Sequence, residues 1–582
     1  MNAGRLAHAE LLEGAREHDA RLRERGLEIW IGAEPTFTLR ESQEPWWLWD
    51  ADGGDKLDRA RTLLAALAPR LAPEAQLFRV VGRQYPGEPG PRFALAAVWE
   101  RGGAGGRRRG GGERAALDWL ERSRWLEPLP CAMPAADERR ACLTVTPDPG
   151  VVEVNMAPAP DLETFSEWIA ATYAAAADAG LSPLRYRWNG ELGGSGGGGQ
   201  VTLGGPALAR SPFALHPQLL PRMIRYWNRH PSLSYAFAPE HAGSASQGPR
   251  ADEGDPERFH ELGVTLDRLA RRGDAIGLAE LHAALAPLLV DASGNTHRAE
   301  LNVEKLCGAD AARGQLGVVE LRALEMPPTP ERLVALGALF RALAASLALH
   351  EPEERLAAWG DELHDRFALP ALLLEDLACV LGALEARGLG LPAPLAAELR
   401  RAPEPWHELE LGGARLVVTP AREFWPLLGD VASQESRPSR LVDSSTRRLE
   451  LRVVAPGGDP GTVAACGFAV PLAPIEGRVG EWVGAVRFRA FRPCPGLHPD
   501  LAPVDPVVLE WRQGGAARAV ALHGWRPGGG AYPALPASDA EARARRLERA
   551  VATAPDPTAP AAPRHASRYT LDLRREASAL RA

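Results

Sequence analysis

Two neighbouring segments, 296–304 and 319–323, carry more residues able to do chemistry than any other part of the chain. In 296–304 polar and apolar residues alternate strictly, which predicts a strand with one polar face. That face would hold Thr296, Arg298, Glu300, Asn302 and Glu304. In the second segment Glu320 and Arg322 alternate with apolar residues, and the Pro pair that follows Met326 ends the strand. An acid and a base at alternate positions of a strand lie side by side, so these segments predict a charged site.

A polar strand face has a second interpretation, because an antiparallel sheet with one face in water shows the same alternation. Two features favour a site. The face mixes Arg, Glu and Asn rather than the interchangeable polar residues of a solvent face, and Lys305 follows it directly. The chain has two lysines, Lys56 and Lys305, among basic residues that are otherwise arginine, and one of them lies here.

Two further acidic residues are predicted on other strands. Glu34 lies in GAEPTF, where a strand is expected to end in a rigid Pro-containing turn. Glu153 lies on the second of two strands predicted in 141–156 around a Pro-Gly turn. Carboxylate oxygens together with substrate phosphates are the ligands that Mg²⁺ prefers, and arginine forks neutralise phosphoryl groups. These glutamates, together with Arg298 and Arg322, suit a site for a divalent metal and a phosphate.

The segment 190–205, GELGGSGGGGQVTLGG, has the composition of a flexible linker. It lacks the GK[ST] ending of a P-loop, which excludes the Walker mechanism. It also runs directly into an alternating strand, and glycines there let a nucleotide or metal approach the main chain closely. We therefore take Gly196, Gly198 and Gln200 as candidate cofactor-binding residues, with Gln200 the first side chain to face the site.

The composition of the chain argues against several classes of protein. The net charge of -8 and the pI near 6.0 argue against a nucleic-acid-binding protein. The beginning of the sequence is a charged helical pattern without the apolar core of a signal peptide, and no uncharged apolar run reaches about 18 residues. We expect a cytoplasmic protein with no membrane partner. The six cysteines show no CxxC pairing, so neither a zinc ribbon nor a disulfide framework is indicated.

The order of patterns predicts an α+β fold in which helices flank a curved, mainly antiparallel sheet in residues 1–328. Leucine- and alanine-rich periodicity predicts three to five packed helices in 329–404. Short alternating strands in 405–536 predict a small all-β sandwich or barrel. A last helix and a disordered Pro/Ala-rich tail are expected in 537–582.

The sequence also resembles a known family, the amidoligase domains often found fused to a transglutaminase-like domain and similar to the glutamine synthetase and glutamate-cysteine ligase fold. The motifs that carry the resemblance follow one another along nearly the whole chain: GAEPTF, GRQYPGEPGPRFAL, VTPDPGVVEVN, GGSGGGGQVTLGG, HPSLSY, LLVDASGNTHRAELNVEKL, LGVVELRALEMPP, LVDSSTRRLELRV and FRAFRPCPGLHP. The resemblance implies a glutamine synthetase-like sheet. It also implies an enzyme that uses ATP and Mg²⁺ to phosphorylate a carboxylate, after which an amine displaces phosphate to form an amide.

The resemblance further implies roles for individual residues and a substrate that is an amino acid, a peptide or a similar small molecule. It puts magnesium at Glu34, Glu153 and Glu320. It puts the phosphates at Arg298 and Arg322. Glu300 would bind the metal or the amine.

Two departures from the family pattern keep alternatives open. Relatives have Asn-His where this chain has Gly199-Gln200, and a glutamine amide is a weaker metal ligand than an imidazole. The transglutaminase-like domain is absent from this sequence, so such a peptidase would be a separate partner. A catalytically weakened scaffold that binds a nucleotide or peptide is therefore the competing hypothesis. A hydrolase using Cys307 and His297 is a third, less favoured one.

Overall fold

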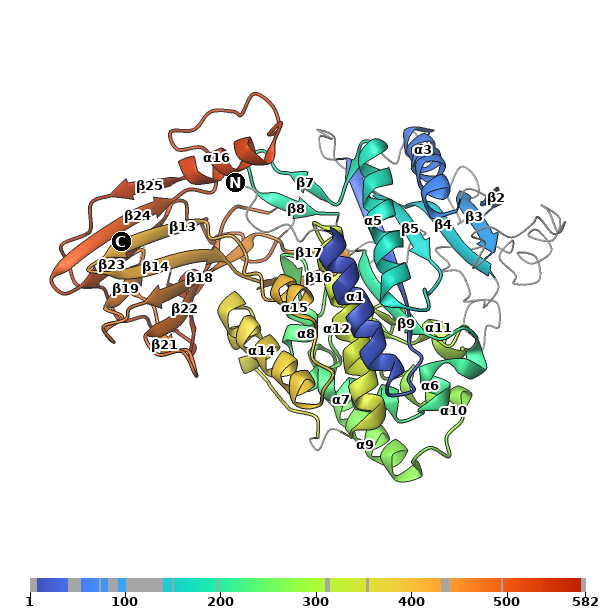
Figure 1. The fold of residues 1–582 in the computed structure, drawn as a ribbon. Coiled ribbons are helices and arrows are strands. Elements are labelled where there is room, and N and C mark those ends of the chain that lie inside the picture. Colours follow the sequence, from blue (N-terminus) through green and yellow to red (C-terminus); the bar gives the residue numbers. More distant parts are fainter. Residues whose placement is uncertain are drawn as a thin grey trace.

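The computed structural model describes residues 8–39, 54–72, 75–81, 93–100, 140–148, 151–195, 198–308, 315–351, 355–430, 440–493 and 496–576. It has a large α/β part, a group of helices, and a C-terminal pair of sheets drawn in orange and red in Figure 1. Residues 82–92, which carry most of the GRQYPGEPGPRFAL motif, and the Gly- and Arg-rich segment 101–113 lie outside the described residues. The mixed α+β class with mainly antiparallel sheets is confirmed.

One nine-stranded sheet organises the α/β part, in the order β11-β12-β9-β1-β5-β4-β3-β2 with β6 also paired to β1. Its neighbouring strands are all antiparallel. The strands are β1 (Trp30–Leu39), β2 (Gln76–Val81), β3 (Phe93–Glu100), β4 (Arg140–Asp148), β5 (Val151–Met156), β6 (Leu181–Ser182), β9 (Gly199–Gly204), β11 (Leu301–Asn302) and β12 (Val319–Leu321).

Helices cover the apolar face of this sheet. The long ones are α1 (His8–Arg23), α3 (Gly54–Leu71), α5 (Leu162–Asp178), α7 (Leu219–Arg229), α9 (Pro256–Arg272) and α12 (Pro330–Leu349). Helices α1, α5 and α12 pack on one another, and α5 and α12 also contact β1 and β9 respectively (Figure 1). Gly337 allows the close approach of α12, because a Cβ there would lie 2.6 Å from Ile31 Cδ1. Alternate residues of the strands, such as Ile31, Val201 and Val319, join this core.

Shorter elements connect these parts. They are β7 (Leu184–Tyr186), β8 (Leu192–Gly194), η1 (Leu208–Arg210), α6 (Pro212–Leu215), α8 (Ser232–Tyr235), β10 (His241–Ala242), η2 (Ala251–Glu253), α10 (Leu278–Leu285) and α11 (Glu304–Cys307). Helices α3, α5, α7, α9 and α10 are among the helices expected to flank the sheet in residues 1–328.

The strand predicted in 296–304 is much shorter than its alternation suggested, since only β11 is a strand and Glu304 begins α11. Polar side chains bond to the backbone locally instead. Asp291 Oδ1 accepts from the amides of Ser293 and Asn295 at 2.7 and 3.0 Å, and Asn295 Oδ1 accepts from the amide of His297 at 2.9 Å. Such Asx turns compete with sheet pairing, which is why the prediction was wrong for 296–300.

Glu34 also lies elsewhere than predicted. It is in the middle of β1 rather than at a strand end, because GAEPTF continues the strand through Pro35. Pro35 is the last residue of β1 paired with β9, where it lies opposite Gly199. A residue without an N–H is tolerated at the end of a pairing. From Thr36 onward β1 pairs with β5.

The predicted helical segment contains four helices among its described residues, which fits the expected three to five. They are α12, α13 (Glu362–Arg366), α14 (Pro370–Ala386) and α15 (Ala393–Leu399). Helix α12 is long and apolar enough to cross a membrane by length and composition, but 83% of its apolar window is buried inside the protein. This burial is typical of a core helix.

The C-terminal strands form two sheets that share one core, as a sandwich does. The first sheet contains β13 (His407–Leu411), β14 (Ala414–Pro420), β18 (Thr446–Val454), β21 (Ala473–Pro474), β22 (Glu481–Arg489) and β26 (Thr570–Asp572). The second contains β19 (Thr462–Ala465), β20 (Phe468–Ala469), β23 (Val507–Gln513), β24 (Ala516–Leu522) and β25 (Ala550–Thr553). Leu416 and Leu451 of one sheet and Leu509 and Trp511 of the other are buried together.

The remaining elements are β15 (Glu423–Phe424), β16 (Leu427–Asp430), β17 (Arg440–Val442), α16 (Asp539–Glu548) and α17 (Leu573–Glu576). The segment expected to be a disordered tail is held on the sandwich in its described part. The amide of Ala469 donates to Ala561 O at 2.9 Å, and β26 pairs with β22 with Leu571 buried. The predicted domain boundaries themselves stay predictions.

A buried ion pair fixes the entry to β1. The carboxylate of Asp19, on α1, lies 2.5 Å from Arg341 Nη1 on α12 and accepts from the amides of Leu162 and Glu163 at the start of α5. Arg341 Nε donates to Ile29 O at 2.9 Å, immediately before β1. Both side chains are almost fully buried. One pair therefore ties three helices to the strand that carries Glu34.

We predict that Arg341→Met lowers the free energy of unfolding by about 3 kcal/mol or more, because it leaves the Asp19 carboxylate buried without its cation. Urea denaturation measures the change. The matched control is Arg16→Met, which breaks an exposed pair with Glu163 and is expected to leave stability nearly unchanged. Equal losses in the two variants would contradict the role given to the buried pair.

Candidate functional site

Strand register gathers the predicted site residues on one face of the nine-stranded sheet. Glu34 lies directly opposite Gln200, and Glu320 lies opposite Thr202. Residues directly opposite in antiparallel strands point to the same side. The pairs Thr36 with Glu153 and Asn302 with Glu320 extend this face to β5 and β11. Its polar side chains are all buried: Glu34, Thr36, Glu153, Asn155, Gln200, Thr202, Asn302 and Glu320.

The solvent-facing interpretation of the alternation is therefore wrong. Glu320 is 0% exposed and Arg322 is 7% exposed. Their side chains contact each other, since Arg322 Nη1 donates to Glu320 Oε1, as their spacing predicted. A buried charged face costs free energy unless each charge has a partner, so this face is built for interactions and not for contact with water.

Lys305 joins the two central carboxylates. Its Nζ lies 2.6 Å from Glu34 Oε1 and 2.9 Å from Glu320 Oε2. The lysine side chain is 12% exposed, and the glutamate side chains are 4% and 0% exposed. The sequence drew attention to Lys305 through the rarity of lysine but assigned it no role. Its bridge joins residues far apart in the chain, and no local pattern reports such a contact.

The charges of this cluster shift one another's pKa. Burial and the like charge of Glu320 raise the pKa of Glu34, against the opposing effect of Lys305. Burial would raise the pKa of Glu320 as well, but Arg322 and Lys305 lower it. Burial would lower the pKa of Lys305, and the two carboxylates raise it instead. The cluster thus holds two carboxylates next to two cations.

Several buried oxygens on this face accept no hydrogen bond from the described residues. They are Gln200 Oε1, Thr202 Oγ1 and Asn155 Oδ1. Arg322 Nε is a buried donor without an acceptor within the described ranges, a property that it shares with the Nε atoms of six other arginines there. Buried polar atoms without partners are uncommon in proteins and call for an explanation, such as an ion or ligand. Oxygen acceptors beside a carboxylate pair are the ligands of a hard cation.

Glu153 lies on the same face but contacts a different residue, Asn155. Asn155 Nδ2 donates to Glu153 Oε1 at 2.9 Å, and both residues are buried on β5. Over the part of the chain that the structure describes, no three His, Cys, Asp or Glu side chains are grouped closely enough to hold a metal ion. The three glutamates predicted to bind magnesium therefore do not form a ready-made triad. Glu34 and Glu320, together with the neutral oxygens of Gln200 and Thr202, fit a hard cation better than the three glutamates do.

The glycine-rich segment packs closely on the sheet. A Cβ at Gly198, whose φ is +92°, would lie 2.1 Å from Thr36 Oγ1, and a Cβ at Gly199 would lie 2.0 Å from Glu325 O. The strand predicted to begin at Gln200 is confirmed as β9. Here the glycines admit protein atoms to close contact with the main chain, which explains them without a ligand. Gly196 lies outside the described residues.

Glu300 belongs to a second buried cluster. Ser234 Oγ donates to Glu300 Oε2 at 2.6 Å, and Arg250 Nη1 lies 3.7 Å from the same oxygen. Arg250 is also paired with Asp252 at 2.8 Å. The two clusters are adjacent along the backbone, because the amide of Arg322 donates to Glu300 O at 2.9 Å. The sequence missed Arg250 and Ser234; the HPSLSY motif was the available signal for Ser234.

The other candidates lie on the turns before β11. Arg298 is half-buried, and its amide donates to Asn295 O at 3.2 Å. His297 Nδ1 bonds to Glu304 Oε2 at 2.9 Å. No described contact joins His297 to Cys307, so the structure gives the hydrolase hypothesis no support.

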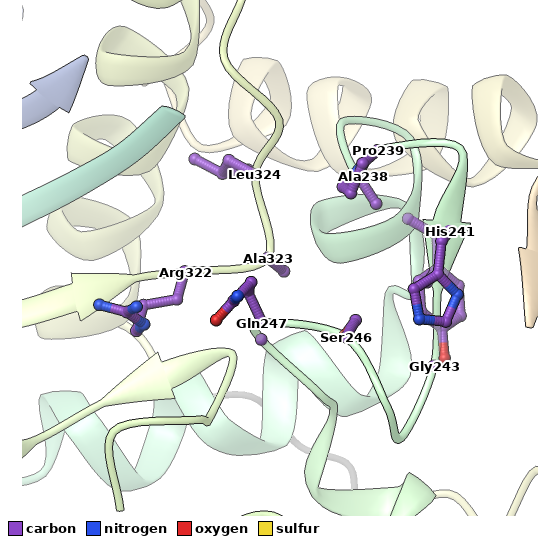
Figure 2. Close-up of a pocket in the computed structure, with 12 residues that line it drawn as sticks. Ala238, Pro239, His241, Gly243, Ser246, Gln247, Arg322, Ala323 and Leu324 are labelled. Atoms are coloured by element: carbon purple, nitrogen blue, oxygen red, sulfur yellow. The ribbon is translucent and has the colours of Figure 1, made fainter. Parts of the chain in front are cut away.

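Arg322 also lines a cavity of about 20 Å³, together with residues that include Tyr235, His241, Gln247 and Ala323. It has room for about one water molecule. Figure 2 shows the Arg322 side chain turned away from His241, on the far side of this cavity. The guanidinium is directed to the glutamate face, where it contacts Glu320.

These features define a class of protein: an α+β protein whose mainly antiparallel sheet buries a charged face of carboxylates, lysine and arginine. The chain belongs to the family described as "Putative amidoligase enzyme (DUF2126)", whose profile matches residues 7–106 and 129–574. The predicted resemblance to an amidoligase family is thereby confirmed, and the family description supports an enzyme of the ligase type. No curated protein matches the chain significantly.

Among solved structures, one described as "Apo GmaS without ligand" is similar to this chain at 13% identity, over 68% of this chain and 73% of that one. Its TM-score is 0.27, which is too low to define a shared fold. The glutamine synthetase-like architecture therefore stays a prediction.

The burial of Glu300 predicts a dependence of stability on pH. Burial raises its pKa to about 7, with Arg250 opposing and Asp252 and Glu253 adding to the rise. Because the pKa of Glu300 is higher in the folded state than its ordinary value, protonation of Glu300 favours the folded state. This contribution to the free energy of unfolding is fully present below about pH 4.5 and is lost as the pH rises through about 7, by up to about 3 kcal/mol. Glu300→Gln keeps an acceptor for Ser234 and removes the titration.

We expect Glu300→Gln to gain stability relative to the wild type between pH 5 and pH 8, as measured by urea denaturation at both values. The comparison with the wild type cancels the titration of other groups. Glu280→Gln, at an exposed glutamate paired with Arg272, is the control and should show no such gain. A difference between Glu300→Gln and the wild type that does not change with pH would contradict the prediction.

Proposed function

We propose that this protein is an ATP- and Mg²⁺-dependent carboxylate–amine ligase that acts through an acyl phosphate on an amino acid, peptide or similar small molecule. Family membership supports the ligase class. The observation that carries the finer proposal is the buried face on which Glu34 and Glu320 lie beside oxygens and an Arg322 nitrogen without described partners. A metal–phosphate complex would satisfy both kinds of unpaired atom.

In this proposal Glu34, Glu320 and Gln200 hold Mg²⁺, with Glu153 nearby on the same face. Mg²⁺, when bound, neutralises charge on the nucleotide phosphates. Arg322 is positioned by Glu320 and donates to a phosphate oxygen from Nε, which has no acceptor among the described residues. Arg298, on the turn before β11, is a second candidate for the phosphates. Gly196 and Gly198 would contribute backbone only.

The proposed reaction has two steps. A substrate carboxylate oxygen attacks the γ-phosphorus of ATP as the bond to the β–γ bridging oxygen breaks, which releases ADP and leaves an acyl phosphate. An amine nitrogen then attacks the acyl carbon, phosphate departs, and a base removes the proton from nitrogen. Glu300 is the candidate for binding the amine, and its pKa of about 7 suits a group that exchanges protons near neutral pH.

A scaffold that binds a nucleotide or peptide for a separate transglutaminase-like peptidase is the second candidate. The observation that favours it is Lys305, which closes the carboxylate pair, together with Gln200 in place of a histidine. Incubation with ATP, Mg²⁺ and pools of amino acids or peptides separates the two functions. Phosphate release that depends on an amine supports the ligase, whereas nucleotide binding without turnover supports the scaffold.

We predict that Arg322→Ala reduces phosphate release by about 10²-fold or more, because the fork that would neutralise the transferred phosphate is lost. Arg322→Lys should be almost as impaired, since an ammonium cannot reproduce the planar geometry. The control is Arg272→Ala, which removes an exposed arginine of α9 and should keep wild-type turnover. Unchanged turnover in Arg322→Ala would mean that the phosphate site is elsewhere.

We also predict that Gln200→His raises Mn²⁺ affinity by about 10- to 100-fold, the range over which the quality of a metal site changes affinity. Isothermal titration measures it. Gln200→Leu is the matched opposite, because it keeps the volume and removes the oxygen; it should weaken Mn²⁺ binding. Equal affinity in both variants would show that residue 200 does not contact the metal.

A further inference from the structure

Lys305 occupies the position between the two carboxylates that a metal ion would need. Its ammonium lies at 2.6 Å and 2.9 Å from oxygens of Glu34 and Glu320, which project from strands on either side of β9. A Mg²⁺ ion shared by the same two oxygens would lie about 2.1 Å from each. The ammonium and the ion therefore cannot be accommodated between these oxygens together.

Charge leads to the same conclusion. Glu34 and Glu320 contribute two negative charges, and Lys305 and Arg322 contribute two positive charges in direct contact with them. A divalent cation added to this buried pair would leave an excess of positive charge unless the ammonium moves away or an anion arrives. The charges of Glu34 and Glu320 are already offset by Lys305 and Arg322 in the free protein, so the two carboxylates attract a free metal ion weakly.

Of the three side chains, that of Lys305 is the one not held on a paired strand. Lys305 lies on the short helix α11, and its side chain is the most exposed of the three at 12%. The glutamates, in contrast, are fixed by strand pairing on both sides of β9. An ammonium released from the carboxylates would be free to pair with an anionic phosphate, for which lysine is a common partner.

We propose that Lys305 is a positioning residue that serves as an internal cation, keeping the Glu34–Glu320 pair closed until a divalent metal arrives together with an anionic phosphate. The proposal rests on the ligase function proposed above and adds an order to it: metal and nucleotide bind as one complex, and free metal binds weakly. Metal entry and the displacement of Lys305 are then the same event.

The test is direct Mn²⁺ binding, followed by electron paramagnetic resonance of the free ion, to the wild type and to Lys305→Met without nucleotide. We expect Lys305→Met to bind Mn²⁺ about tenfold or more tightly than the wild type, as expected when a competing internal ligand is removed. Mn²⁺ should also raise the melting temperature of Lys305→Met by more than that of the wild type. Lys305→Arg, which keeps the charge, is the control and should bind as weakly as the wild type.

Equal Mn²⁺ affinity in the wild type and Lys305→Met would overturn the internal-cation proposal and leave the ligase proposal standing. Tight binding by Lys305→Arg would overturn it as well, since charge would not be the cause. If no variant binds Mn²⁺ even with a non-hydrolysable ATP analogue, the proposed metal site is wrong and both proposals fail.

Should Lys305→Met not fold, a crystal structure of the wild type with Mn²⁺ and that analogue decides the question. Displacement of Lys305 Nζ from between Glu34 and Glu320 is the expected result. Mn²⁺ bound to both carboxylates with the lysine unmoved would overturn the proposal.

Discussion

The contact of Lys305 with Glu34 and Glu320 is the interaction on which the rest of this structure depends. Two carboxylates buried in a sheet cost several kcal/mol each unless cations offset them. Lys305 and Arg322 supply those cations only while α11, β12, β9 and β1 keep their relative positions. The fold therefore has to hold four segments, from residue 30 to residue 322, in one register. The site and the sheet are stabilised by the same contacts.

The register is enforced from the opposite face. Ile31, Val201 and Val319 alternate with the site residues and lie in the main core under the helices. A slip of one residue in any of these strands would turn a glutamate into that core and an apolar residue onto the charged face. The Asp19–Arg341 pair adds a polar anchor, since it binds the backbone just before β1. Core packing thus determines where the charges lie.

Sequence alternation was sufficient to predict which residues share a face where a strand forms, as in β12, where Glu320 lies on the charged face and Val319 and Leu321 lie in the core. The alternation gave a wrong prediction at 296–300. There Asp291 and Asn295 accept hydrogen bonds from backbone amides within turns, and the sequence of these turns happens to alternate between polar and apolar residues as a strand does. The alternation placed the strand end too early at Glu34, because Pro35 occupies the one position where its missing N–H costs little. The bridge by Lys305 and the separate cluster of Glu300 could not be predicted. Both depend on pairs of residues brought together only by the sheet and by the loop before η2.

The Glu300 cluster links the charged face to the C-terminal part of the chain. Arg250 is paired with Asp252, next to Glu253, and Glu253 bonds to His364 at 2.8 Å. The His364 ring stacks on Phe424 at 3.8 Å, and Arg422 Nε donates to Tyr235 O at 3.0 Å. These contacts cross both predicted boundaries, at 328 and at 404. A shift of the sandwich relative to the sheet would therefore be felt at Arg250 and Glu300, one backbone hydrogen bond away from Arg322. Through Phe424 of β15 and Arg422, the C-terminal part of the chain therefore braces the segments that carry Tyr235 and Glu253, next to Arg250.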